Sequence, residues 1–189
     1  MDRGKVILLN GASSSGKSTI AKALQAAIDQ PFWCMSIDHF NAAKMLPQER
    51  IASGEYPWKD LRQKFFDGFH RCLPALATAG NNLIVEPIIE TPKWMSDLLE
   101  LLAGLDVFFV GVHCPLEVLE ERERARGDRR LGEARTDFET THGFCTYDFE
   151  LNSTEPLTAN IDGVLNAWRG RKSPSAFELS RSAIAVDLG

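Results

Sequence analysis

The sequence predicts an α/β protein whose parallel sheet is covered by helices on both faces. Two observations support this fold class. Short apolar segments typical of strands alternate along the chain with segments of helical periodicity. A glycine-rich motif at residues 11–18 separates the first strand-like segment from the first helix-like one. With 189 residues, the chain is long enough for one domain with a substantial core.

The predicted elements follow in order along the chain. We expect strands at residues 4–10, 33–37, 82–86, 106–112 and 147–151, and helices at residues 17–29, 58–79, 91–103, 115–126 and 156–168. Thr91 and Pro92 are typical of an N-cap followed by a first-turn proline, and Gly104 follows the end of that helix. Residues 39–57 contain two prolines and a glycine, which favour a loop or short helices.

Two segments depart from this alternation. We expect a lid at about residues 122–146, of which residues 127–146 are charged and then polar and should form a mobile flap. Residues 1–170 would then form the domain, and residues 171–189 a C-terminal tail. The tail contains the apolar run 182–186, so the sequence favours either an added edge strand or a frayed, disordered end.

Composition excludes several classes of protein. The formal net charge is −5 at pH 7, so no general basic surface points to nucleic acid. No apolar run approaches the length of a membrane span. Residues 1–4 lead straight into the first strand, so we expect no signal peptide and a cytoplasmic location.

We expect buried reduced thiols rather than disulfides or a metal site at the four cysteines, which are Cys34, Cys72, Cys114 and Cys145.

Residues 11–18 read Gly-Ala-Ser-Ser-Ser-Gly-Lys-Ser, which is a complete phosphate-binding loop. In such a loop the glycines let the backbone wrap a phosphate, and the N–H groups and the following helix N-terminus bind its negative charge. We expect Lys17 to reach the β- and γ-phosphates of ATP and the Ser18 hydroxyl to bind Mg²⁺. The predicted nucleotide-binding residues are Gly11, Ala12, Ser13, Ser14, Ser15, Gly16, Lys17, Ser18 and Thr19.

Asp38 follows the second predicted strand and is the candidate catalytic base. Ligands of parallel α/β sheets bind outside the carboxyl ends of the strands, so Asp38 should face the γ-phosphate across from the loop. A carboxylate there can accept the proton of an attacking hydroxyl. The alternative is that Asp38 caps a helix or turn. We expect the neighbouring His39 to lie at the surface or behind the site.

Glu86 ends the third predicted strand and is followed by Pro87. Its carboxylate could hold a water molecule on Mg²⁺ or contact the acceptor. The alternative is a strand-end carboxylate without a function.

The run at residues 122–130 contains five arginines. We expect Arg122, Arg126 and Arg129 to contact the transferring phosphoryl group, where guanidinium groups stabilise developing charge. The alternative for this run is a solvated helix face. We expect Arg124, Arg130 and Arg135 to face solvent.

A second group of residues could support the sheet or line the acceptor pocket. His142, Tyr147 and Asp148 precede the fifth predicted strand and Thr154 follows it; structural support is the preferred interpretation for each. Aromatic residues between positions 40 and 69 could form a pocket wall, although ordinary core is the preferred interpretation for any one of them.

Together these residues resemble the chloramphenicol phosphotransferase family of P-loop kinases, from about Val6 to Trp168. The resemblance rests on the loop at residues 9–18, Asp38, the segments 106–114 and 122–129, and His142 with Tyr147-Asp148. It implies a five-stranded parallel sheet in the order of nucleoside monophosphate kinases. It also implies Asp38 as general base, Lys17 and Ser18 as contacts to ATP and Mg²⁺, and three lid arginines. This sequence departs from the family at Glu86-Pro87, where the family has a pair of aspartates.

These observations predict an ATP- and Mg²⁺-dependent phosphotransferase that acts on a hydroxyl of a small molecule, with chloramphenicol or a related antibiotic as one acceptor. One alternative is a nucleoside, nucleotide or other metabolite kinase of the same fold. A second alternative is a nucleotide-sensing module without turnover. The sequence leaves open whether the chain forms a homo-oligomer.

Overall fold

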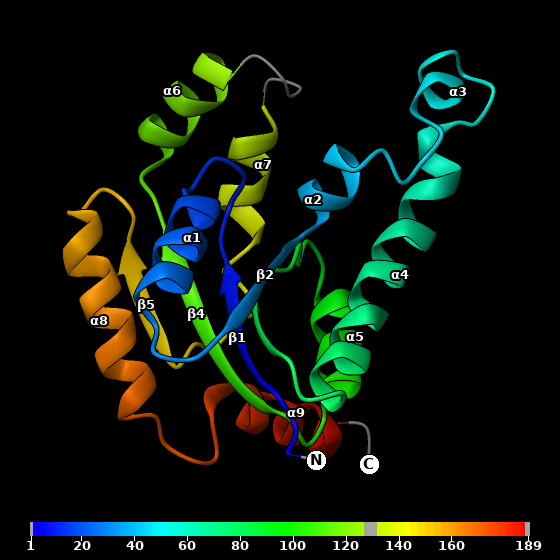
Figure 1. The fold of residues 1–189 in the computed structure, drawn as a ribbon. Helices are drawn as coiled ribbons and strands as arrows, with labels where there is room; N and C mark the ends of the chain where they lie inside the picture. The colour runs from blue at the N-terminus through cyan, green and yellow to red at the C-terminus, as the bar shows by residue number, and fades with distance from the viewer. Residues whose placement is uncertain (1, 127–131, 188–189) are drawn as a thin grey trace.

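The structure, a computed structural model, describes residues 2–126 and 132–187. The strands form one parallel sheet in the order β2-β3-β1-β4-β5 (Figure 1). They are β1 (Lys5–Asn10), β2 (Phe32–Ser36), β3 (Asn82–Glu86), β4 (Asp106–His113) and β5 (Phe149–Asn152). The predicted fold class and strand positions are therefore confirmed, with ends shifted by one or two residues.

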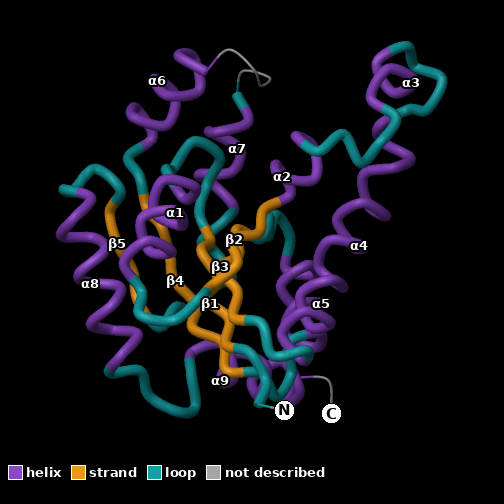
Figure 2. The backbone as a smooth tube through the Cα atoms, viewed as in Figure 1, coloured by secondary structure: helices purple, strands orange, loops and turns teal. Residues whose placement is uncertain are grey.

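Helices cover both faces of the sheet (Figures 1 and 2). The first five are α1 (Lys17–Ala27), α2 (Ile37–Ala42), α3 (Gln48–Ala52), α4 (Trp58–Thr78) and α5 (Pro92–Leu101). They are followed by α6 (Leu116–Arg126), α7 (Glu133–Thr140), α8 (Leu157–Arg169) and α9 (Ala176–Asp187). Helices α1 and α8 pack on one face, and α4, α5 and α9 pack on the other.

The central strand β1 shows why both faces need a cover. Val6 and Leu8 belong to the core beneath α4, α5 and α9, whereas Ile7 and Leu9 belong to the core beneath α1 and α8. All four side chains are fully buried. Because successive strand residues point to opposite faces, a strand that is apolar at every position is stable only between two helical layers.

The expected helix boundaries are borne out at α5. The Thr91 side chain accepts a hydrogen bond from the Trp94 N–H at 3.2 Å, and Pro92 occupies the first turn. After the helix, Gly104 has a φ of 75°, which is a conformation that glycine adopts without strain.

Strand β2 ends earlier than Asp38. The Ser36 side chain accepts a hydrogen bond from the His39 N–H at 3.3 Å and caps α2. Asp38 therefore lies in the first turn of a helix rather than at the end of a strand, and His39 is exposed. The segment 39–57 contains the rest of α2 and the whole of α3, which agrees with the expected short helices.

Two expectations need correction. In the lid, residues 127–131 lie outside the described part of the chain, but residues 133–140 form the helix α7, which the sequence interpretation did not include. The tail does not form an edge strand, because residues 176–187 are helical. An Asp148 carboxylate oxygen accepts the Ala176 N–H at 2.6 Å, and Phe177 is buried, so the start of α9 is fixed against the sheet.

The cysteines and the helices add two findings. The four cysteines are free, as expected, but the expectation of buried thiols is wrong for three of them: Cys114 is buried, whereas Cys34, Cys72 and Cys145 are partly exposed. Within the described ranges, no helix has the length and apolar character that a membrane crossing requires.

We predict that His70 makes the protein less stable in acid. Its side chain is 2% exposed, packs against Phe69 and Trp94, and burial lowers its pKa to about 4. The unfolded chain takes up this proton near pH 6.5, so the free energy of unfolding should fall as the pH drops from about 6.5 to about 4.

Urea unfolding at several pH values tests this prediction. His70→Phe should make the dependence on pH shallower in that window, whereas His39→Gln, at an exposed site, should leave it unchanged. An unaltered pH dependence in His70→Phe would contradict the prediction.

Candidate functional site

The loop at residues 11–18 joins β1 to α1 in a conformation that its glycines require. Gly16 has a φ of 92°. A Cβ atom at Gly11 would lie 2.4 Å from the Val112 carbonyl oxygen of β4, so no other residue fits there. The loop also closes on itself, because the Ser15 N–H donates to the Ala12 carbonyl at 3.2 Å. These contacts fold the loop tightly at the carboxyl end of the central strand.

Lys17 lies along this loop. Its Nζ donates to the carbonyl oxygens of Gly11 and Ala12 at 2.8 and 2.7 Å. The ammonium group is thereby held at the loop, where a bound phosphate would also lie.

The side chains of Ser18 and Glu86 meet between α1 and β3. The Ser18 Oγ donates to Glu86 Oε2 at 2.7 Å, and Glu86 is 8% exposed. Oxygen ligands of this kind suit Mg²⁺, which usually keeps several water molecules and takes only one or two protein ligands. The pair therefore fits the metal predicted for this loop. The described residues contain no group of three or more His, Cys, Asp or Glu side chains that could hold a metal by themselves.

A continuous cleft of about 1600 Å³ connects these residues to Asp38. It opens at the carboxyl ends of the strands, which is where ligands of such sheets bind. Its walls include the whole phosphate-binding loop except Ala12, together with Asp38, Glu86 and Arg122. The structure thus brings five predicted elements of the site to one cleft: the loop, Lys17, the Ser18–Glu86 pair, Asp38 and Arg122.

Of the three arginines expected to contact the phosphoryl group, Arg122 is the one whose side chain the structure describes. Its Nη1 donates to the Ser14 carbonyl at 3.4 Å and to Ser153 Oγ at 3.3 Å, so the guanidinium lies beside the loop. The side chain of Arg126 and the whole of Arg129 lie outside the described part of the chain. Arg135 pairs with Glu120 at 2.6 Å on the surface, as expected for a solvent-facing residue.

The lid is held together by Glu123, which the sequence interpretation did not single out. Its buried carboxylate accepts the backbone N–H groups of Gly132 and Ala134 at 2.9 and 2.8 Å, at the start of α7. A charged acceptor at a helix N-terminus is stabilising. Glu123 therefore ties α6 to α7 across residues 127–131.

Asp137 of α7 contacts the phosphate-binding loop directly. Its Oδ2 accepts the Ser13 N–H at 2.8 Å, and its side chain lines the cleft. Sequence analysis missed this residue, because a contact across 124 positions leaves no local pattern.

On the far side of the cleft, Arg62 of α4 is packed between aromatic rings and a carboxylate. Its guanidinium lies 4.8 Å from the ring centre of Phe66 and 5.3 Å from that of Trp94, and it pairs with Glu90. Trp58 lines the same wall and is 38% exposed. Arg62 and Trp58 thus line the same cleft as Asp38.

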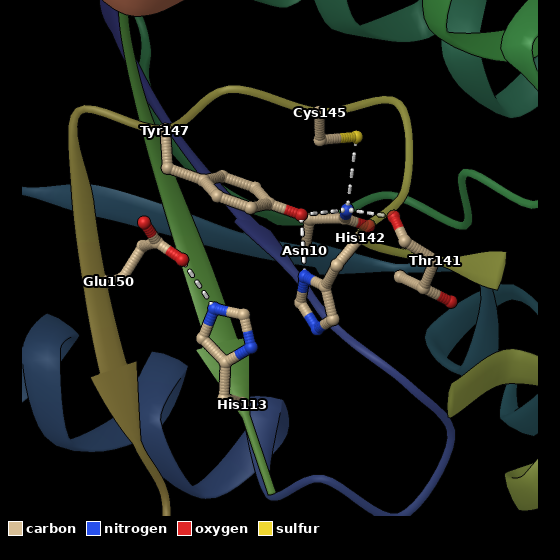
Figure 3. Close-up of polar contacts among 7 residues, drawn as sticks. All are labelled: Asn10, His113, Thr141, His142, Cys145, Tyr147 and Glu150. Atoms are coloured by element: carbon tan, nitrogen blue, oxygen red, sulfur yellow. Dashed lines mark hydrogen bonds and ion pairs between the residues drawn. The ribbon is translucent and has the colours of Figure 1, made fainter. Parts of the chain in front are cut away.

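Behind the loop, a polar cluster ties the exit of the lid to β1 (Figure 3). The buried Asn10 donates from Nδ2 to the Tyr147 hydroxyl at 2.8 Å and to the Thr141 carbonyl at 3.2 Å. The Tyr147 hydroxyl also meets His142 Nδ1 at 2.7 Å. The Tyr147 oxygen accepts from Asn10, and its hydrogen can be donated to His142 Nδ1 when that nitrogen is unprotonated.

The pKa shifts agree with this direction of the hydrogen bonds. Burial, and then the neighbouring His113, lower the pKa of His142 to about 4. Burial also raises the pKa of Tyr147, so its hydroxyl keeps its hydrogen. His113 stacks on His142 with ring centres 4.0 Å apart, and its Nε2 meets Glu150 at 2.6 Å (Figure 3).

The other candidate support residues have structural contacts. Asp148 accepts the Phe109 N–H at 2.8 Å as well as the Ala176 N–H, and Thr154 donates to the Asn152 side chain. Neither residue lines the cleft. Tyr147 packs so closely on β4 that a Cβ at Gly111 would lie 2.8 Å from its ring.

Comparison with known proteins gives matches over nearly the whole chain. The profile described as chloramphenicol phosphotransferase-like protein matches residues 4–166. A protein of Mycobacterium tuberculosis, provisionally named an O-phosphotransferase, is 33% identical to this chain over 203 residues. That match covers 96% of this chain and 89% of the mycobacterial protein.

Solved structures with a similar fold include several kinases. The APS kinase of Mycobacterium tuberculosis, in complex with AMPPNP and APS, has a TM-score of 0.64 and 19% identity, covering 89% of this chain and 99% of the kinase. A gluconokinase from Sinorhizobium meliloti has a TM-score of 0.60 and 21% identity, covering 88% and 93%. At these identities the likeness is one of fold.

We predict that Tyr147→Phe lowers the free energy of unfolding by about 1–2 kcal/mol, because His142 Nδ1 loses its partner and Asn10 loses one acceptor. Urea unfolding at neutral pH measures the change. Tyr56→Phe is the matched control, since the Tyr56 ring lies under Arg50 near the surface. Equal effects of the two substitutions would contradict a specific role for the cluster.

Proposed function

The chain belongs to the chloramphenicol phosphotransferase-like family and is a phosphotransferase of the P-loop kinase type, and we propose that it moves the γ-phosphoryl group of ATP to a hydroxyl of a small molecule. The observation that carries the proposal is the continuous cleft that joins the phosphate-binding loop and the Ser18–Glu86 pair to Asp38. A nucleotide-sensing module without turnover would not need a carboxylate across the cleft from the loop.

The loop and its neighbours bind the donor. Backbone N–H groups of residues 13–19 would donate hydrogen bonds to the phosphates, the Lys17 ammonium would offset their charge, and Ser18 and Glu86 would hold Mg²⁺. When bound, the ion would offset the charge of the phosphate oxygens. Arg122 approaches from the lid, and we propose that Arg126 and Arg129 join it as positive charges around the transferring group.

Asp38 acts on the acceptor. Its carboxylate accepts the hydrogen of the attacking hydroxyl as the oxygen approaches phosphorus, and then releases it to solvent. Asp38 lies on the first turn of α2, and α2 leads directly from β2, so its backbone is fixed relative to the loop.

The acceptor wall favours an alcohol without a phosphate group. Among the described residues 40–71, Arg62 is the cationic side chain that lines the cleft, and it is already paired with Glu90. A monophosphate acceptor would bring two negative charges to a wall that also carries Asp38. Chloramphenicol or a related antibiotic is therefore preferred over a nucleotide as acceptor, and other uncharged metabolites remain alternatives.

Release of ADP from Mg·ATP by the purified protein tests the proposal. It should be stimulated by chloramphenicol or by another member of a panel of hydroxylated antibiotics, nucleosides and sugars, and it should be abolished in Lys17→Ala. ATP binding without stimulation by any acceptor would favour the sensing module.

We predict that Asp38→Asn lowers the kcat of acceptor-dependent ADP release by roughly 10²–10⁴-fold and leaves the Kd for ATP nearly unchanged, because a general base acts on the acceptor and not on the donor. Steady-state kinetics and calorimetry measure the two quantities. Asp162→Asn, at an exposed position on α8, is the control. Turnover near that of the wild type in Asp38→Asn would remove Asp38 from the mechanism.

Glu86→Gln should raise the Mg²⁺ concentration needed for half-maximal activity by about 10–100-fold, which is the usual effect of losing an outer-shell or ligating oxygen. Binding of Mn²⁺ in the presence of ADP, followed by electron paramagnetic resonance, gives a readout that does not depend on turnover. Glu90→Gln is the control and should change the KM for the acceptor instead. An unchanged metal requirement in Glu86→Gln would place the ion elsewhere.

A further inference from the structure

A carboxylate of the lid occupies part of the phosphate-binding loop. Asp137 Oδ2 accepts the Ser13 N–H at 2.8 Å, although the N–H groups of this loop are the groups that bind phosphate. We propose that Asp137 is an internal competitor for the phosphates of ATP, so that it sets nucleotide affinity and couples nucleotide entry to movement of α7. The proposal rests on the proposed function, because it requires ATP to bind at this loop.

The lid holds Asp137 at the loop from both ends of α7. At the N-terminal end, Glu123 accepts the N–H groups of Gly132 and Ala134. At the C-terminal end, Asn10 donates to the Thr141 carbonyl, and Thr141 N–H donates back to the Asp137 carbonyl. The position of Asp137 is therefore fixed by its helix. Its side chain is also only partly exposed, which limits the directions in which it can rotate.

Phosphate and Asp137 compete for two reasons. The Ser13 N–H has one hydrogen, so a good hydrogen bond to a phosphate oxygen replaces the bond to the carboxylate. A carboxylate that stayed beside a triphosphate would also experience like-charge repulsion, which is strong in a partly desolvated cleft. Nucleotide binding thus requires Asp137 to withdraw, and α7 shifts with it.

A purely structural contact makes the opposite prediction. If Asp137 only holds the loop in shape, removing it should loosen the loop and weaken nucleotide binding. If Asp137 competes with phosphate, removing its charge should strengthen nucleotide binding. The sign of the change in affinity separates the two roles.

The experiment is calorimetric titration of the full chain with Mg²⁺ and a non-hydrolysable ATP analogue, for the wild type, Asp137→Asn and Asp137→Ala. Both variants should bind the analogue about tenfold more tightly than the wild type, which is the effect expected from losing a competing charged hydrogen bond at a partly exposed site. The gain in affinity should be smaller at high salt, because part of it comes from removing electrostatic repulsion, which salt screens.

Glu133→Gln is the matched control. Glu133 lies on the same helix and lines the same cleft, and among the described residues no hydrogen bond joins its side chain to the loop. Glu133→Gln should change the affinity for the analogue clearly less than Asp137→Asn does, since it removes the same charge without removing a competitor.

Each outcome decides between the roles. Unchanged or weaker binding by both Asp137 variants, with a wild type that binds, overturns the inference and leaves the proposed function intact. An equal gain in Glu133→Gln also overturns it, because general charge then explains the effect. Failure of the wild type and all variants to bind the analogue overturns the proposed function as well.

Discussion

The backbone N–H groups at the start of α1 and in the turn before it favour a negatively charged partner, and the Ser13 N–H meets one in the Asp137 carboxylate. Much of the site follows from this preference. Gly11 lies so close to Val112 that only glycine fits, and Gly16 takes a left-handed conformation that turns the chain into α1. The carbonyl oxygens left on the other side of the turn are contacted by the Lys17 ammonium. The loop therefore has a conformation and a charge distribution that suit an anion.

The surrounding structure holds this loop in place from several directions. β1 is the central strand and is buried on both faces, so the loop starts from a fixed point. Asn10, the last residue of β1, is hydrogen-bonded to the segment that follows α7. The lid is therefore not an independent flap, because the segment that follows α7 is hydrogen-bonded to β1 behind the loop. The two lid helices bring opposite charges to the cleft, with Arg122 on α6 and Asp137 on α7.

Much of the architecture could be predicted from the sequence. The strands are apolar at nearly every position, the loop has a complete motif, and Thr91 and Gly104 mark helix ends by local hydrogen bonding and backbone conformation. These signals are short-range, so they can be read without a structure. The place of Glu86 at the end of β3 is also a local signal, whereas its contact with Ser18 depends on the pairing of β3 with β1.

The parts that could not be predicted depend on long-range contacts. The apolar run of the tail predicts a strand or a disordered end. Packing at Phe177 and capping by Asp148 stabilise a helix there instead. Tertiary contacts of this kind override a weak local preference. The sequence predicts Asp38 directly at the end of a strand, whereas the Ser36 cap ends β2 earlier and puts Asp38 in the first turn of α2. The contacts of Glu123 and Asp137 were missed, because they depend on how the lid folds back onto the loop.

The most direct test of the account follows the γ-phosphorus of ATP. The purified protein, Mg·ATP and a stimulating acceptor can be monitored by phosphorus nuclear magnetic resonance as the reaction proceeds. The account predicts that the γ-phosphorus signal is replaced by that of a phosphate monoester of the acceptor, in step with ADP. Appearance of inorganic phosphate alone, or an ATP signal that never changes with any acceptor, would contradict it.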